Sequence, residues 1–120
     1  MRIQYGILFV SDMSRSVAFY RDLLKIPLKF QSDEWSEFLS QGATLALHQT
    51  NHAASQAKPL RGENAGHCRI GFQVTDLDDF HQRMLSASVP CVQEPTMTFG
   101  AKVAQYADPD GLVFSVGELP

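Results

Sequence analysis

Hydrophobic and polar residues along this chain switch from one periodicity to another near the start. Residues 3–10 alternate and are rich in β-branched and aromatic side chains, which predicts a strand buried on both faces. Asp12 or Ser14 then caps a helix with an apolar stripe, and Pro27 helps to end it. Three short strands are expected next, at residues 28–31, 35–39 and 44–48. The first half of the chain therefore has the predicted order β-α-β-β-β.

The second half repeats this order. A strand is predicted at residues 68–74 and a helix at 76–87. Asp108-Pro109-Asp110-Gly111 is a turn sequence, because proline fixes one dihedral angle and glycine permits a positive one. Further strands are expected near residues 91–92, from 97 or 102 to 107, and from 112 to 116. The connector at residues 49–66 is polar, with little periodicity.

Two sequence echoes show that one supersecondary unit occurs twice. Val10-Ser11-Asp12-Met13 corresponds to Val74-Thr75-Asp76-Leu77, an offset of 76 − 12 = 64. Gly42 and Gly111 each precede an apolar strand, at an offset of 111 − 42 = 69. We expect one α+β domain over residues 1–120, with module one at about 1–50, the connector at about 49–66 and module two at about 67–120. A cleft between two such modules would form a binding site.

Composition narrows the possible partners. The 10 Lys+Arg and 13 Asp+Glu give a net charge of −3, which argues against a nucleic-acid partner. No stretch approaches the roughly 20 apolar residues of a membrane span, so we expect a cytoplasmic protein with no membrane partner. Cys68 and Cys91 lack chelating spacing and are interpreted as buried free thiols.

The strand-Asp-helix starts and the turn sequence resemble the vicinal oxygen chelate superfamily, over nearly the whole chain. That superfamily includes glyoxalase I, bleomycin resistance proteins, fosfomycin resistance proteins and extradiol dioxygenases. The residues that carry the resemblance are Val10-Ser11-Asp12-Met13 with Phe19-Tyr20, and Asp108-Pro109-Asp110-Gly111 before Leu112–Val116. It implies two pseudo-symmetric β-α-β-β-β modules that form a half-open curled sheet, the glyoxalase/bleomycin resistance fold, usually completed in a homodimer. In the superfamily's enzymes, each module supplies two metal ligands.

Carried over by position, the resemblance places Tyr5, Ala46, Arg69 and Ser115 where metal ligands would stand. Ala46 supplies no donor atom, and the guanidinium of Arg69 would repel a cation. Ser115 is a poor neutral ligand, and the phenolate of Tyr5 cannot hold a metal alone. We therefore expect no cofactor and the loss of the usual metal chemistry.

The same positions suggest a site for an organic ligand. Arg69 carries a donor fork suited to a carboxylate, phosphate or sulfonate, unless it points outward or pairs with an acidic neighbour such as Glu37. Tyr5 and Phe9 share a strand face and form either an aromatic wall or core packing. Trp35 is either a stacking platform or a buried apolar residue.

Two histidines keep a metal alternative open. His48 lies two residues beyond Ala46, and His67 lies two residues before Arg69. Each histidine is therefore expected on the same strand face as that residue. With a third donor such as Glu63 they would bind one divalent metal; otherwise they are ordinary histidines near strand ends.

Our first hypothesis is a metal-free homologue of the bleomycin resistance proteins that binds a small organic molecule in a concave cleft. Its ligand-binding residues would be Arg69, Tyr5, His48, Ser115, Trp35 and Phe9, and its assembly a homodimer. The acidic net charge favours a cationic ligand and Arg69 an anionic group, so the ligand class stays open. The alternatives are a divalent-metal-dependent lyase, isomerase or dioxygenase that uses His48 and His67, and a dimeric interaction module without a ligand.

Overall fold

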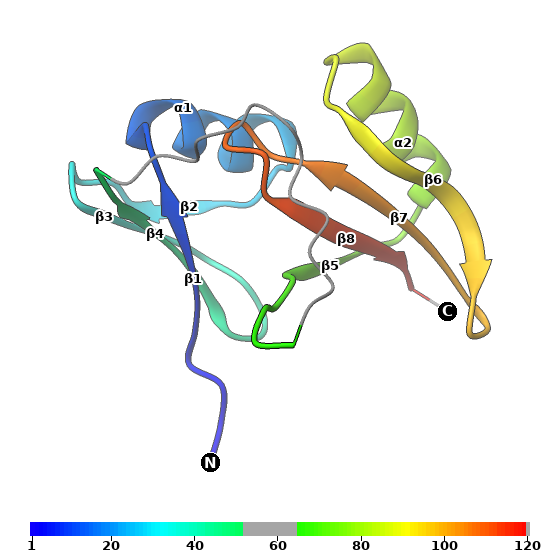
Figure 1. Cartoon of the computed structure of the whole chain (residues 1–120), viewed down its shortest axis with the longest axis horizontal. Helices are drawn as coiled ribbons and strands as arrows, with labels where there is room; N and C mark the ends of the chain where they lie inside the picture. The colour runs from blue at the N-terminus through cyan, green and yellow to red at the C-terminus, as the bar shows by residue number, and fades with distance from the viewer. Residues whose placement is uncertain (52–64, 120) are drawn as a thin grey trace. The chain divides into compact units, whose positions relative to one another are not determined.

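The computed structural model describes residues 1–51 and 65–119 (Figure 1). The chain divides into two compact units, which we call unit 1 (Met1–Gln56) and unit 2 (Ala57–Pro120). Most of the expected connector, with Glu63, lies outside the described residues. None of the helices in the described ranges has the length and apolar character needed to cross a membrane.

Unit 1 has the predicted order of elements. Its elements are β1 (Tyr5–Val10), α1 (Met13–Ala18), the π-helical turn η1 (Phe19–Leu23), β2 (Leu28–Phe30), β3 (Trp35–Phe38) and β4 (Thr44–Gln49). The strands form one sheet in the order β1-β4-β3-β2. β1 runs parallel to β4, and the other neighbouring strands are antiparallel. Parallel strands cannot be joined by a tight hairpin, so a long connection that includes the helix separates β1 from β4.

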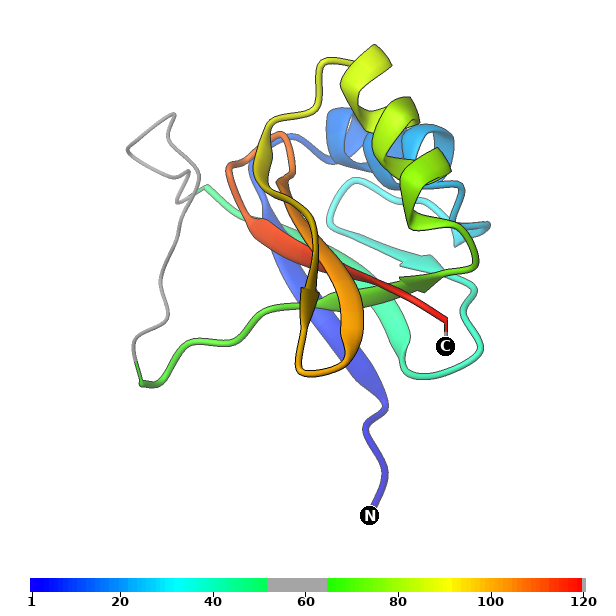
Figure 2. The same cartoon turned by 90° about the vertical axis from the view of Figure 1, so that its right-hand side faces the viewer.

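Unit 2 repeats this arrangement. Its elements are β5 (Gly71–Val74), α2 (Leu77–Ser86), β6 (Cys91–Thr98), β7 (Ala101–Ala107) and β8 (Val113–Glu118). The strand order is β5-β8-β7-β6, with β5 parallel to β8. α2 packs against β6, β7 and β8 of its own sheet (Figure 2). The expected α+β fold, built from two copies of one unit, is confirmed.

In each unit, a side chain at the end of the last strand forms a hydrogen bond with the start of the helix. Gln49 Oε1 accepts a hydrogen bond from the N–H of Met13 at 2.8 Å, and Glu118 Oε2 accepts one from the N–H of Leu77 at 2.9 Å. The two fastening residues are 118 − 49 = 69 positions apart, the offset seen in the sequence. Each thereby satisfies an amide that the first helical turn leaves without an intrahelical partner.

The helices begin where the repeat places them. Asp12 Oδ1 accepts a hydrogen bond from the N–H of Arg15, and Asp76 Oδ1 accepts one from the N–H of Asp79, each at 3.0 Å. These are ordinary N-caps, so the sequence echo is a pair of helix starts. Of the two caps proposed for the first helix, Asp12 is the correct one, because Ser14 lies inside α1.

Strand β1 of unit 1 is buried on one face only. Leu8 and Val10 of β1 belong to the core, together with Val17 of the helix. Ile7 and Phe9, on the other face of β1, keep 44% and 65% of their surface exposed. The prediction that this strand is buried on both faces is therefore wrong, because α1 packs against a single face of the sheet.

β5 is shorter than predicted. The strand begins at Gly71 rather than Cys68, because its pairing with β8 starts at the hydrogen bond from Ser115 N–H to Ile70 O, 2.9 Å. His67 and Cys68 precede the strand and are exposed, and Arg69 is half-buried. Cys68 is thus not the buried thiol that was expected. Cys91 is half-buried, and burial raises the pKa of its thiol, which favours the unreactive thiol form.

The turn before β8 is organised by one buried carboxylate. Asp108, 5% exposed, accepts hydrogen bonds through Oδ1 from the N–H groups of Asp110 and Leu112, both at 2.9 Å. Gly111 has a φ of 83°, a conformation that residues with a Cβ rarely adopt. The turn chemistry predicted for Asp108-Pro109-Asp110-Gly111 is confirmed, and Asp108 is its anchor.

The core of unit 2 contains a buried phenol. Tyr106 is fully buried, with ring centroids of Phe80 and Phe114 at 5.4 and 5.9 Å. Its hydroxyl lies 2.8 Å from His81 Nδ1. Burial raises the pKa of Tyr106 far above its ordinary value, and the nearby Cys91 thiolate adds to the shift.

This shift predicts how stability depends on alkaline pH. A group whose pKa is higher in the folded state contributes stability below its unfolded pKa and loses it as pH rises above that value. We expect the free energy of unfolding to fall by up to about 1.4 kcal/mol per pH unit above about pH 10 on account of Tyr106. In the Tyr106→Phe variant this slope should be shallower. Urea denaturation at pH 8, 10 and 11 measures it, and parallel slopes for the two proteins would disprove the role of Tyr106.

Candidate ligand-binding site

Unit 1 presents a row of functional side chains on the sheet face that α1 does not cover, here called the open face. The strand register fixes its members: Ile7 lies opposite Ala46, Ala46 opposite Glu37, and Trp35 opposite His48. Side chains on paired positions point to the same side of a sheet. The open face consists of Tyr5, Ile7 and Phe9 on β1, Trp35 and Glu37 on β3, and Thr44, Ala46 and His48 on β4.

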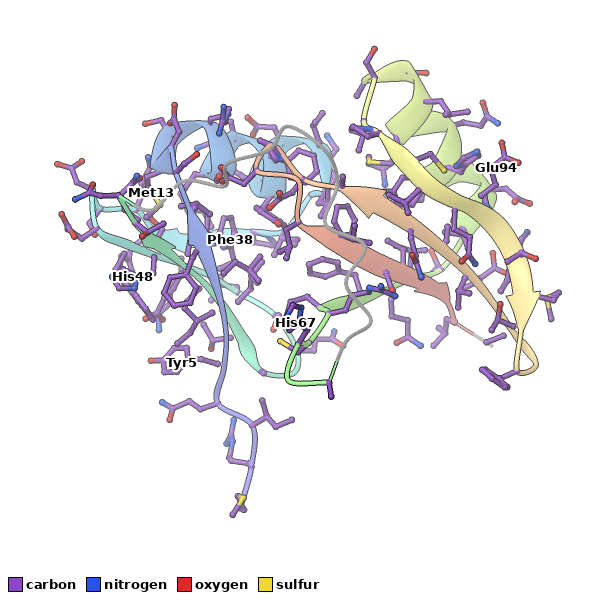
Figure 3. All side chains as sticks on the ribbon, in the orientation of Figure 1. Tyr5, Met13, Phe38, His48, His67 and Glu94 are labelled. Atoms are coloured by element: carbon purple, nitrogen blue, oxygen red, sulfur yellow. The ribbon has the colours of Figure 1, made fainter. Side chains whose placement is uncertain are left out.

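Four of these residues form an aromatic cluster: Tyr5, Phe9, Trp35 and His48. The ring centroids of Tyr5 and Trp35 are 5.8 Å apart, with the planes at 81°. His48 lies 5.8 Å from Trp35 and 5.5 Å from Phe9. Tyr5 and His48 are labelled in Figure 3, where their side chains project from β1 and β4. Tyr5 is 38% and Phe9 65% exposed, so part of the cluster is accessible to solvent.

Ala46 makes the contact between Tyr5 and Trp35 possible. Tyr5 is in register with Thr44, and Trp35 with His48, so Ala46 lies midway between the two ring-bearing positions. The two rings reach toward each other diagonally across the central strand, as long aromatic side chains can. Ala46 has no exposed surface. The methyl group of Ala46 supplies no atom to a metal, but its small size leaves room for the rings of Tyr5 and Trp35 to come into contact.

Glu37 brings a nearly buried carboxylate to the open face. It is 9% exposed, and its Oε2 accepts a hydrogen bond from Trp35 Nε1 at 2.8 Å. Its Oε1 lies 3.8 Å from Lys29 Nζ and accepts no hydrogen bond from the part of the chain that the structure describes. The Lys29 side chain is 56% exposed. A carboxylate at this depth keeps one oxygen available to a further donor.

The corresponding face of unit 2 is chemically different. Gly71 pairs with Ser115, and Gln105 pairs with Ser115 from the other side, so Ser115 takes the place of Ala46 and Gln105 that of Glu37. Gly117 pairs with Val103, where unit 1 has His48 and Trp35. At the positions of His48, Trp35 and Glu37, the strands of unit 2 thus carry uncharged residues without an aromatic ring.

The predicted site residues fall into two groups. Tyr5, Phe9, Trp35 and His48 are brought together on unit 1, as described above. Arg69 and Ser115 belong to unit 2, where Ser115 is half-buried on β8 and Arg69 lies two residues before β5. The role of all six residues in binding stays a prediction.

The donor set at the described positions does not fit a divalent metal. In residues 1–51 and 65–119, no three His, Cys, Asp or Glu side chains are grouped so that they could hold an ion. His48 packs among aromatic rings, and His67 is exposed ahead of β5. Glu63, the third donor considered for these histidines, lies outside the described residues.

Sequence reasoning did not find Glu37 and Lys29 as residues of the candidate site. The sequence suggests Glu37 as an acidic partner for Arg69 and not as a ligand-binding residue. The spacing Trp35-Ser36-Glu37 on one strand places the first and third residues on the same face, and that signal was present in the sequence. The contact with Lys29 depends on an irregular pairing between β2 and β3, which no spacing rule predicts.

The fold is that of a known class of proteins. Residues 2–116 match the Glyoxalase/Bleomycin resistance protein/Dioxygenase superfamily, and the chain belongs to it. The resemblance inferred from the two strand-Asp-helix starts and the Asp-Pro-Asp-Gly turn is confirmed.

Individual relatives are distant in sequence. The Bacillus subtilis protein YraH is 26% identical over 111 residues, which cover 86% of this chain and 87% of YraH. Metallothiol transferase FosB of Staphylococcus saprophyticus is 26% identical over 110 residues, which cover 89% of this chain and 70% of FosB. The crystal structure of lactoylglutathione lyase from Agrobacterium tumefaciens aligns with a TM-score of 0.74 and 21% identity, over 97% of this chain and 92% of that one. The last likeness shows a shared fold.

Proposed function

We propose that this protein binds a small organic ligand on the open face of unit 1 and does so without a metal ion. The observation that carries the proposal is the aromatic cluster, whose rings meet over Ala46 while Tyr5 and Phe9 remain accessible. Ligand sites combine aromatic walls with a few polar groups that fix orientation. Here the rings supply apolar contact area, and Glu37 and the Tyr5 hydroxyl supply the polar anchors.

The proposal extends to unit 2 and to assembly. Arg69 and Ser115 take part in ligand binding on unit 2, and the protein acts as a cytoplasmic homodimer. Sedimentation equilibrium measures the assembly, and a monomer at micromolar concentration would remove the dimer from the proposal.

A second candidate is a metal-dependent enzyme of the same superfamily: a lyase, isomerase, dioxygenase or transferase. The similarity to metallothiol transferase FosB favours it. In this chain such an enzyme would use His48 and His67 as non-standard ligands. Neither Ala46 nor Arg69 can donate to a cation, so the two histidines would need donors from elsewhere in the chain.

One pair of measurements separates these functions. Protein purified without a tag or chelator is analysed for bound metal and then screened for thermal stabilisation by small organic molecules. We expect less than one metal ion per ten chains, and at least one compound that stabilises the protein. A ligand at 100 times its dissociation constant adds about 2.7 kcal/mol. Near-stoichiometric zinc, nickel, iron or manganese that is lost in the double variant His48→Ala, His67→Ala would favour the enzyme. A screen without a stabilising compound would favour an interaction module.

A further inference from the structure

We infer that the open face of unit 1 selects organic cations, with an alkylammonium group held between the aromatic cluster and Oε1 of Glu37. This inference rests on the proposed function, because it names the ligand class of the same site. It needs only residues of unit 1.

The first argument is charge. Of the side chains that β1, β3 and β4 place on the open face, Glu37 is the one with a full charge, and it is negative. Trp35 Nε1 donates to Oε2 and fixes the carboxylate in place. Oε1 accepts no hydrogen bond from the described residues and has only the distant Lys29 ammonium group, at 3.8 Å, as a partner among them. Electrostatic interactions are strengthened by the low local dielectric of a group that is 9% exposed. An anionic ligand would be repelled at this position.

The second argument is the arrangement of the rings. The planes of Tyr5 and Trp35 are nearly perpendicular, at 81°, and form the two walls of a corner. The face of an aromatic ring is negative, so a cation in such a corner is attracted by both walls. Tryptophan is the best of the aromatic residues for this contact. Rings at right angles beside a carboxylate are suited to an ammonium group that carries methyl or methylene substituents.

The third argument is Lys29, which shows that a cation reaches this carboxylate. Its ammonium group lies 3.8 Å from Glu37 Oε1, beyond hydrogen-bond distance, and its side chain is 56% exposed. An ion pair with so exposed a lysine contributes little, since water screens it. A ligand cation that also contacts the rings can displace it.

Inorganic cations are poor competitors for this site. Magnesium and calcium require six or more oxygen ligands, and the side chains described on the open face offer the Glu37 carboxylate and the hydroxyls of Tyr5 and Thr44. An organic ammonium ion is less strongly hydrated, and it gains from apolar contact with the rings. The site is therefore selective for organic cations over metal ions.

The chain carries its own probe for the test, because Trp35 is its single tryptophan. Phenyltrimethylammonium and tert-butylbenzene have the same shape and differ in charge. Titration of each into the full-length protein, followed by Trp35 fluorescence, compares the two directly. We expect the cation to bind about tenfold more tightly than its neutral isostere.

Three variants connect the preference to named residues. Glu37→Gln keeps an oxygen for Trp35 Nε1 and removes the charge; it should weaken the cation about tenfold and change the neutral compound by less than about twofold. Lys29→Gln removes the competing cation and should tighten phenyltrimethylammonium binding by about twofold or more. Glu94→Gln removes the same charge from an exposed position on β6 of unit 2 and should change neither affinity. Circular dichroism confirms that each variant is folded.

The outcomes separate this inference from the proposed function. Equal binding of the two compounds, or binding of neither while other molecules stabilise the protein, overturns the cation preference and leaves small-molecule binding intact. No binding by any compound overturns both. If Glu37→Gln fails to fold, the effect of Lys29→Gln decides, and an unchanged affinity for phenyltrimethylammonium counts against the inference.

Discussion

Replacing Ala46 with leucine will abolish ligand binding at the aromatic cluster while leaving the protein folded. The leucine side chain would occupy the midpoint between Tyr5 and Trp35 and force their rings apart from the 5.8 Å contact. We expect affinity for any ligand of this face to fall more than tenfold. Overpacking a fully buried position should lower the free energy of unfolding by about 1–3 kcal/mol. Trp35 fluorescence and urea denaturation measure the two effects.

A matched variant tests whether position rather than size is responsible. Ala87→Leu makes the same change at an exposed residue after the end of α2. It should alter the free energy of unfolding by less than about 0.5 kcal/mol and leave binding unchanged. Wild-type ligand affinity in Ala46→Leu would refute the claim that the rings must meet over residue 46.

The largest loss of stability from one turn residue is expected for Asp108→Ala. Oδ1 of Asp108 accepts two backbone N–H groups, and alanine would leave both donors in a part-buried turn without an acceptor. Each unsatisfied donor costs about 1–3 kcal/mol, so the two together give an expected decrease of about 2–6 kcal/mol in the free energy of unfolding. Urea denaturation followed by far-UV circular dichroism measures the decrease.

Two comparisons isolate the role of the Asp108 oxygen. Asp108→Asn keeps an oxygen at the same position and should retain all but about 1 kcal/mol of the stability. Asp33→Ala changes an exposed aspartate between β2 and β3 and should have an effect below about 0.5 kcal/mol. If Asp108→Ala proved as mild as Asp33→Ala, the turn would not depend on this carboxylate.

The sequence predicts the order of elements well because local chemistry determines it. Asp12 and Asp76 are strong N-cap residues before apolar periodicity, and Asp108-Pro109-Asp110-Gly111 has few alternatives to a turn. The exact extent of a strand is decided by its partner. β5 begins at Gly71 rather than Cys68 because hydrogen bonding to β8 starts there, and periodicity alone does not contain that information.

The site is predicted less completely, because it depends on register between strands. The sequence indicates Tyr5, Phe9 and Trp35 by their aromatic chemistry and His48 as a possible ligand contact. Their convergence follows from pairings between β1 and β4 that join residues 39 positions apart, since 44 − 5 = 39. The family resemblance identifies Ala46 as a position that has lost its metal donor. Its place midway between Tyr5 and Trp35 becomes apparent only when both neighbouring strands are in register with β4.

Gln49 in one unit and Glu118 in the other each hold a helix to the last strand of its own sheet. This arrangement affects how the sequences of the two copies can diverge. Each bond closes within its own copy, so a substitution that reshapes one sheet face leaves the helical anchor of the other copy intact. Duplicated halves held in this way can acquire unlike chemistry. The present chain illustrates it: Trp35 and Glu37 in the first copy stand where Val103 and Gln105 stand in the second.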